Sequence, residues 1–129
     1  MPFSWFFRGE TKDPIHFYHY TNRDAADSIS AEGKIRNQGR GVLLTTLEPE
    51  SYYRDEILQN NYGFPVPNHL RKNADHCVRV RSKQLIAEHL QKEQASGERL
   101  VYRYYKDIRV KETDVFDKPK CERSSPKKA

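Results

Sequence analysis

The sequence predicts a single α+β domain, and three observations lead to this prediction. The chain has 129 residues, which is the usual length of one domain and enough to bury a core. Aromatic residues make up 12% of the chain, too many for a disordered protein, although only 36% of all residues are apolar. Segments that alternate like strands are interleaved with segments of helical spacing. We therefore expect short strands and two or three short helices around a largely aromatic core.

The first half of the chain predicts two strands, each followed by a helix. Residues 15–20 follow a turn signal and alternate as a strand, with Phe17 and His19 on the same face. Residues 21–33 begin with T-x-x-D, which can cap a helix, and end in a glycine that suits a left-handed stop. Residues 40–46 form the second strand. A proline then opens a helix that ends near residue 58.

The second half predicts a long loop, two or more strands and a third helix. The loop over 60–75 contains a glycine and two prolines. Residues 77–81 alternate as a strand, and a serine then caps a helix over 82–94. Residues 98–105 form a further strand, and 108–116 supply one or two more.

The basic charge of the chain is concentrated at its end. The formal net charge is +5, and residues 117–129 contribute five basic and two acidic side chains. Residues 1–116 therefore have little excess charge. We expect them to form the domain and 117–129 to be a basic tail without ordered structure. A solvated terminus is the ordinary explanation for such a tail, ahead of nucleic-acid binding.

The cysteines and the apolar stretches exclude several classes of protein. Cys77 and Cys121 are far apart and match neither CxxC nor Cys/His ligand spacing, so we expect no metal site and no disulfide framework. Every apolar stretch falls short of a membrane span, and residues 1–7 lack the basic start of a signal peptide. We expect a cytoplasmic monomer that contacts no membrane; the nucleus, or a host cell that receives an effector, are the alternative locations.

Three features could support chemistry when each is taken alone. His19 lies on the inward face of its strand, where a histidine bonded to a backbone carbonyl is the ordinary explanation. Glu98 stands at the start of a strand, and a carboxylate directed into a cleft there could stabilise positive charge. Gly39-Arg40-Gly41 could bring the backbone close to a phosphate. None of these features is specific by itself.

The order of the features is more specific than any one of them. Tyr18-His19-Tyr20-Thr21 precedes a capped helix with Asp27-Ser28-Ile29, then Gly33-Lys-Ile35, Gly41-Val-Leu-Leu-Thr45 and a helix with tyrosines. This series, densest over 17–53, resembles the NAD-binding core of the H-Y-E class of ADP-ribosyltransferases, which includes diphtheria-type toxins and poly(ADP-ribose) polymerases. Glu98-Arg-Leu-Val-Tyr102 is similar to the strand that begins with the catalytic glutamate of that class. The resemblance implies the split β-sheet core of the class.

The resemblance also implies roles for individual residues. His19 would hydrogen-bond the adenine-side ribose of NAD, and the backbone of Tyr20 would bind the nicotinamide carboxamide. Tyr52 or Tyr53 would stack on the nicotinamide ring. Glu98 would bind the 2′-hydroxyl of the nicotinamide ribose, so His19 and Glu98 are the expected catalytic pair.

Three further points belong to the same implied site. Thr21 and Leu43 complete the expected NAD-binding set. The class has a tyrosine at the position of Leu43, so an apolar wall replaces an aromatic face there. This departure is compatible with NAD binding and lowers the expected catalytic rate. Asp107 and Glu112 are the alternatives to Glu98 as the acid, because strand boundaries can shift by a few residues.

The resemblance implies a mono-ADP-ribosyltransferase of the toxin or effector type. NAD would be the co-substrate, and ADP-ribose would pass to a protein or nucleic-acid acceptor, or to water as in a NAD glycohydrolase. No metal would be needed, and an immunity or host protein is the expected partner. The alternatives are an inactive member of the fold that binds a nucleotide or a partner, an NAD-dependent RNA 2′-phosphotransferase, and a nucleic-acid-binding module based on the aromatic and basic residues 102–106.

Overall fold

The computed structural model describes residues 16–93 and 99–117. The strands in these ranges are β1 (His16–Thr21), β2 (Lys34–Ile35), β3 (Val42–Thr45), β4 (His76–Arg81), β5 (Leu90–Lys92), β6 (Val101–Tyr104), β7 (Ile108–Arg109) and β8 (Val115–Asp117). The helices are α2 (Arg23–Glu32) and α3 (Arg54–Tyr62), and the 3-10 helices are η1 (Asn68–Ala74), η2 (Ser82–Gln84), η3 (Ala87–His89) and η5 (Glu112–Asp114).

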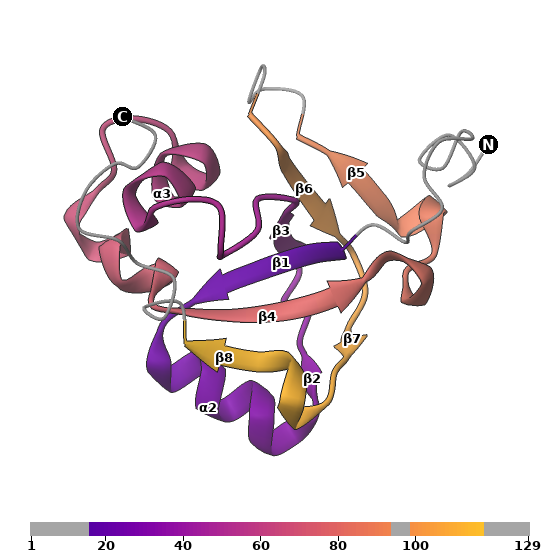
Figure 1. Ribbon diagram of the computed structural model, residues 1–129. Helices are drawn as coiled ribbons and strands as arrows, with labels where there is room; N and C mark the ends of the chain where they lie inside the picture. Colours follow the sequence, from indigo (N-terminus) through magenta and orange to yellow (C-terminus); the bar gives the residue numbers. More distant parts are fainter. Residues whose placement is uncertain (1–15, 94–98, 118–129) are drawn as a thin grey trace.

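An antiparallel sheet forms the centre of the fold (Figure 1). Its strand order is β5-β6-β3-β1-β4-β8, and β2 pairs with β7 in a separate two-stranded ladder. In Figure 1, α2 lies below the sheet beside β8, and α3 lies on the opposite side, at the upper left. The predicted α+β class is confirmed.

The sheet buries an apolar core on each face. One core contains Phe17 with Val78 and Val80, and it packs against α2 and the β2–β7 ladder. The other contains Tyr18 and Tyr20, and it packs against α3 and η1. Adjacent residues of β1 therefore point to opposite faces, as the predicted alternation requires. Because the faces are covered by different helices, β1 is a fixed central strand.

Helix α2 begins and ends at residues that can satisfy its free backbone groups. The side chain of Asn22 accepts a hydrogen bond from the backbone N–H of Ala25 at 2.9 Å, so the cap is Asn22, and the predicted capping role of Thr21 is wrong. Gly33 ends the helix in the left-handed region at φ 75°, as predicted.

Helix α3 lies further along the chain than predicted. Residues 49–52 form a turn, in which the N–H of Ser51 donates to the carbonyl of Glu48 at 3.1 Å. The backbone N–H of Tyr53 donates to Glu56 Oε1 at 2.7 Å, which caps the helix there. The helix predicted over 49–58 therefore runs over 54–62, because this cap outweighs the preference of proline for a first turn.

The helix predicted over 82–94 is wrong. Two 3-10 turns and strand β5 lie within residues 82–92 instead. Leu85 is buried as expected, but Ile86 is 54% exposed and its N–H donates to the hydroxyl of Tyr104 at 2.9 Å. Pairing of β5 with β6 completes the edge of the sheet, and this tertiary pairing outweighs helix propensity. The loop predicted over 60–75 is also interrupted, by η1.

Several predictions concern residues outside the described ranges. Glu98, residues 1–15 and most of the basic tail, 118–129, are among them. Within the described ranges Cys77 is buried. No helix in these ranges is long and apolar enough to cross a membrane.

Candidate functional site

A cleft opens where the central sheet splits between β1 and β3. Strand β1 pairs with β4 along its whole length, but with β3 at a single bridge, Tyr18 opposite Thr45. Beyond this bridge the end of β1 and the start of β3 diverge. A cavity of about 650 Å³ lies along the split and is lined by both strands, by α2 and by β2. The opening is therefore a feature of the backbone and does not depend on one missing side chain.

His19 lies in this cleft in a fixed orientation. Its Nδ1 is 2.9 Å from the carbonyl oxygen of Leu43 across the split. A carbonyl oxygen can only accept, so Nδ1 carries the hydrogen and Nε2 is the free acceptor of a neutral ring. Burial lowers the pKa of His19, and the bond to the Leu43 carbonyl opposes this shift. At neutral pH the ring can therefore accept a hydrogen bond from a hydroxyl of a ligand.

The other predicted strand residues lie at the same split. Thr21 and Leu43 both line the cleft, on β1 and β3 respectively. The side chain of Tyr20 points to the opposite face, where its hydroxyl donates to the carbonyl of Leu47 at 2.8 Å. Only the backbone of Tyr20 is near the cleft, which is the part of this residue that the resemblance requires.

The structure does not bring Tyr52 or Tyr53 into the cleft. Tyr52 is 37% exposed in the turn before α3, and Tyr53 is the cap residue of that helix. Among the described residues, the tyrosine that lines the cleft is Tyr62, in the last turn of α3. Its position follows from the shifted helix, and Gly63 after it is the sequence feature that could have identified it.

Hydrogen bonds connect Tyr62 to the start of α2. Asn73 donates to the hydroxyl of Tyr62 at 3.4 Å and accepts from the side chain of Asn22 at 3.1 Å. Asn22 also caps α2, so the phenol and the helix are linked. Burial raises the pKa of Tyr62, against the hydrogen bond from Asn73 and the charge of Arg103. The phenol is therefore protonated at neutral pH and can donate to a ligand.

The described lining of the cleft has four basic side chains and one carboxylate. They are Lys34, Arg36, Arg40 and Arg103, together with Glu32. Three of the bases have acidic partners: Arg36 binds Glu32 at 2.8 Å, Lys34 lies 3.6 Å from Asp107, and Arg103 binds Glu93. Arg40 has no carboxylate partner within the described residues. The positive excess suits an anionic ligand such as a phosphate.

A glycine-containing turn forms the mouth of the cleft. The Asn37 side-chain oxygen accepts from the backbone N–H groups of Gly39 at 3.1 Å and Gly41 at 3.0 Å. Both glycines have positive φ, 95° and 85°. A Cβ at Gly41 would lie 2.9 Å from Cε1 of Tyr105, so that ring packs directly on the turn. The turn at Gly39-Arg40-Gly41 therefore lies at the cleft, and its approach to a phosphate stays a prediction.

The three residues predicted as the acid, Glu98, Asp107 and Glu112, differ in their position relative to the cleft. Glu98 is outside the described residues; the backbone N–H of its near neighbour Leu100 donates to the side chain of Asn60 at 2.8 Å. Asp107 is exposed near the mouth, and its hydrogen bond from the Asn37 N–H lowers its pKa. Glu112 lines a different pocket, on the side of α2 that faces β8. Of the two alternatives to Glu98, only Asp107 is near the cleft.

The residues predicted to form a nucleic-acid module are parts of the sheet and its edge. Tyr104 is 3% exposed in the core on β6, and Tyr102 packs against that core. Arg103 alternates with them and faces the cleft. Tyr105, after the strand, is 38% exposed. Stacking on this segment is therefore limited to Tyr105.

The described residues contain no group of three or more His, Cys, Asp or Glu side chains that could bind a metal ion. The cleft instead offers a neutral histidine acceptor, a phenol donor and a basic lining. Comparisons of the chain with protein-family models, with curated proteins and with solved structures give no match.

Proposed function

We propose that the cleft binds NAD and that the protein is a mono-ADP-ribosyltransferase, which passes ADP-ribose to a macromolecular acceptor or to water. The observation that supports this most is the split between β1 and β3, with His19 oriented across it by the carbonyl of Leu43. The split β-sheet is what the resemblance to the H-Y-E class implies. A dinucleotide needs a long groove that meets both its sugars and its phosphates, and the lining of this cleft includes His19 and four basic side chains.

Each group in the cleft suits one part of NAD. The free Nε2 of His19 would accept from a ribose hydroxyl. Arg40, which has no carboxylate partner in the described part of the chain, would bind the pyrophosphate beside the turn at Gly41. Tyr62 would contact the nicotinamide in the role that the resemblance gives to Tyr52 or Tyr53.

The reaction requires charge stabilisation more than proton transfer. The bond between ribose C1 and the nicotinamide nitrogen breaks, its electron pair leaves with neutral nicotinamide, and an oxocarbenium-like sugar forms. The acceptor then attacks C1 and releases a proton. A carboxylate beside the sugar would stabilise the cation, which is the role that the resemblance gives to Glu98. Positioning of both sides of the bond supplies the rest of the rate enhancement.

Release of free nicotinamide from NAD tests this proposal. The wild-type chain should release nicotinamide, and His19→Ala should lower kcat/KM at least tenfold, which corresponds to about 1.4 kcal/mol. His16→Ala is the matched control, because His16 lies on the opposite face of the same strand, and it should change the rate less than about threefold. The absence of release from the wild type, or equal release from His19→Ala, would contradict the proposal. NAD binding without release would instead identify a nucleotide-binding member of the fold.

One observation favours a second function, an NAD-dependent RNA 2′-phosphotransferase. Enzymes of that kind use basic residues around the histidine, and four basic side chains line this cleft. This function differs in its requirement for RNA. Nicotinamide release that depends on a 2′-phosphorylated RNA would support it, and release in the absence of RNA would exclude such a requirement.

A further inference from the structure

We propose that the acceptor is a single-stranded nucleic acid, which binds along a basic track from the mouth of the cleft to a second groove. This inference rests on the proposed function and adds the class of acceptor to it. The track has three parts: the turn at Arg40 with the ring of Tyr105, the two-stranded ladder of β2 and β7, and a groove beyond the ladder. We call this last part the basic groove.

The basic groove is a cavity of about 450 Å³ with four basic side chains. They are Arg81, Lys83, Arg109 and Lys111. Its one carboxylate, Asp114, is 3% exposed and accepts from the backbone N–H of Lys111 at 3.1 Å. Arg81 lies 3.7 Å from Asp114, but Lys83, Arg109 and Lys111 have no acidic partner within the described residues. Three uncompensated charges therefore face solvent in one groove.

Hydrogen bonds fix the walls of the basic groove. The side chain of Gln84 donates to the carbonyl of Arg109 at 2.8 Å and accepts from the backbone N–H of Arg81 at 3.1 Å. The N–H of Val110 donates to the carbonyl of Gly33 at 3.0 Å. The backbone that presents these cations is thus ordered before any ligand binds, which lowers the entropic cost of binding.

The β2–β7 ladder joins this groove to the cleft. Lys34 pairs directly with Arg109, and the neighbouring pair, Ile35 with Ile108, is buried in the core. Alternation along both strands therefore directs Lys34 and Arg109 outward on the same face. Lys34 lines the cleft and Arg109 lines the basic groove. Arg109, and Lys34 beside the carboxylate of Asp107, therefore carry positive charge between the two cavities.

The ring at the other end of the track favours nucleic acid over an acidic protein. Tyr105 is 38% exposed and lies against Gly41, next to Arg40. An exposed ring beside a guanidinium is a surface on which a base can stack, whereas an acidic side chain has no ring that could stack on it. Phosphates on the cations and a base on Tyr105 would hold the strand beside the cleft. A nucleophilic nitrogen or oxygen of the strand would then attack ribose C1 as nicotinamide leaves, and its proton would pass to solvent.

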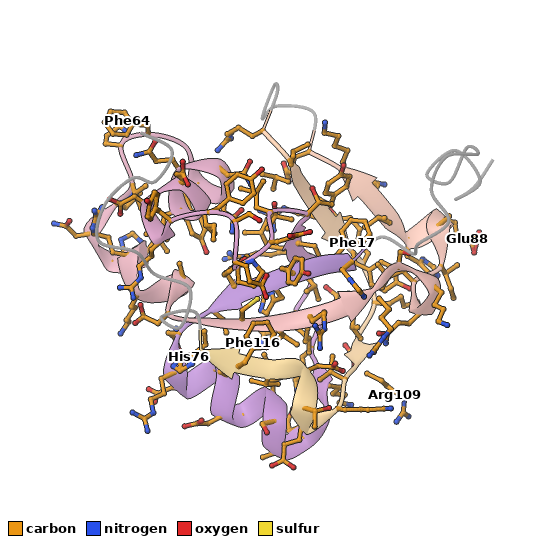
Figure 2. The ribbon with its side chains drawn as sticks, viewed as in Figure 1. Phe17, Phe64, His76, Glu88, Arg109 and Phe116 are labelled. Carbon is orange, nitrogen blue, oxygen red and sulfur yellow. The ribbon has the colours of Figure 1, made fainter. Side chains whose placement is uncertain are left out.

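Fluorescence anisotropy with a labelled single-stranded oligonucleotide of about 12 nucleotides tests the track, without NAD. The double variant Lys83→Glu/Arg109→Glu should bind at least tenfold more weakly than the wild type. Arg71→Glu/Lys72→Glu, on η1, is the control with the same change of net charge and should bind within about threefold, because screening limits distant charges. In Figure 2, Arg109 lies at the lower right, and His76, which follows η1 closely in the chain, lies apart from it on the left.

The exposed tyrosines provide a second matched pair. Tyr105→Ala should weaken oligonucleotide binding about fivefold or more and leave the binding of inorganic polyphosphate unchanged. Tyr52→Ala removes a ring of similar exposure, 37%, outside the cleft and should change neither. Any one of three results would overturn the proposal. These are an equal loss of oligonucleotide affinity in both charge variants, no effect of Tyr105→Ala on that affinity, and binding of polyglutamate as tight as that of the oligonucleotide.

The two proposals fail in different ways. Lys83→Glu/Arg109→Glu should leave the rate of nicotinamide release unchanged when water is the acceptor of ADP-ribose, since neither residue lines the cleft. If oligonucleotide binding depends on the basic groove but no nicotinamide is released, the proposed enzyme activity fails and the surface stands. If nicotinamide is released and oligonucleotide binding is absent, the acceptor class is wrong.

Discussion

Replacement of Gly41 and of Gly39 by alanine measures how closely Tyr105 packs at the mouth of the cleft. Both glycines have positive φ, 85° and 95°, and both donate to the side chain of Asn37. A Cβ at Gly39 would meet no atom of the described residues within 4 Å, its chain neighbours aside. At Gly41 it meets Cε1 of Tyr105 at 2.9 Å and Cβ of Arg103 at 3.1 Å. The two substitutions therefore share the backbone strain and differ in the contact.

The expected losses follow from these contacts. A left-handed conformation costs a residue with a Cβ about 1–2 kcal/mol, so Gly39→Ala should lower the free energy of unfolding by about that amount. Gly41→Ala adds a steric term of about 1–2 kcal/mol, because the ring of Tyr105, the closest contact, must be displaced from the turn and Cβ of Arg103 lies close behind it. Replacing glycine by alanine also restricts the unfolded chain, but this effect is the same for both variants and cancels in the difference between their stabilities. We expect Tm to be lower for Gly41→Ala by about 3–10 °C.

Chemical and thermal unfolding of the two variants, and of each combined with Tyr105→Ala, give this difference directly. In the Tyr105→Ala background the excess loss at Gly41 should shrink by about half or more, because the closest contact is absent. Equal stability of Gly39→Ala and Gly41→Ala, or no coupling between Gly41 and Tyr105, would refute the packing of this ring on the turn.

Three further predictions concern the cleft and the core. Burial lowers the pKa of His19, so the contribution of His19 to stability is complete above the unfolded pKa of about 6.5 and is lost as pH falls below that value. His19→Gln should therefore lose less stability than the wild type between pH 7 and 5. Identical stability profiles of the two proteins in chemical unfolding would contradict this. Tyr62→Phe, which loses the bond from Asn73, should raise the Kd for NAD about fivefold by calorimetry, and an unchanged Kd would exclude the phenol from the site. Phe17→Ala should destabilise the fold by about 3–5 kcal/mol in denaturant unfolding, because Phe17 is 0% exposed, and a loss below about 1 kcal/mol would contradict its central position.

The parts of the fold that follow from local pattern could be predicted from the sequence. Alternation located β1 and β4, and Gly33 located the end of α2. The helix expected over 82–94 could not be excluded locally, because its apolar spacing fits a helix as well. Strand β5 forms only because the neighbouring strand β6 offers it hydrogen bonds. Such a pairing is a tertiary effect that sequence spacing does not encode.

The candidate site was predictable on the strands and less so elsewhere. His19, Thr21 and Leu43 lie in the cleft because the strand register places them there. The cleft aromatic was missed because a cap at Tyr53 shifts α3 and carries Tyr62 into the lining. The basic lining was missed because Arg103 on β6 joins Lys34, Arg36 and Arg40 only in the folded chain.

A crystal structure of the chain with a non-hydrolysable NAD analogue would show whether the cleft binds NAD. We expect the analogue in the split between β1 and β3, with a ribose hydroxyl within hydrogen-bond distance of Nε2 of His19 and the pyrophosphate beside Arg40. An analogue bound elsewhere, or one in the cleft that leaves Nε2 of His19 without contact, would contradict it.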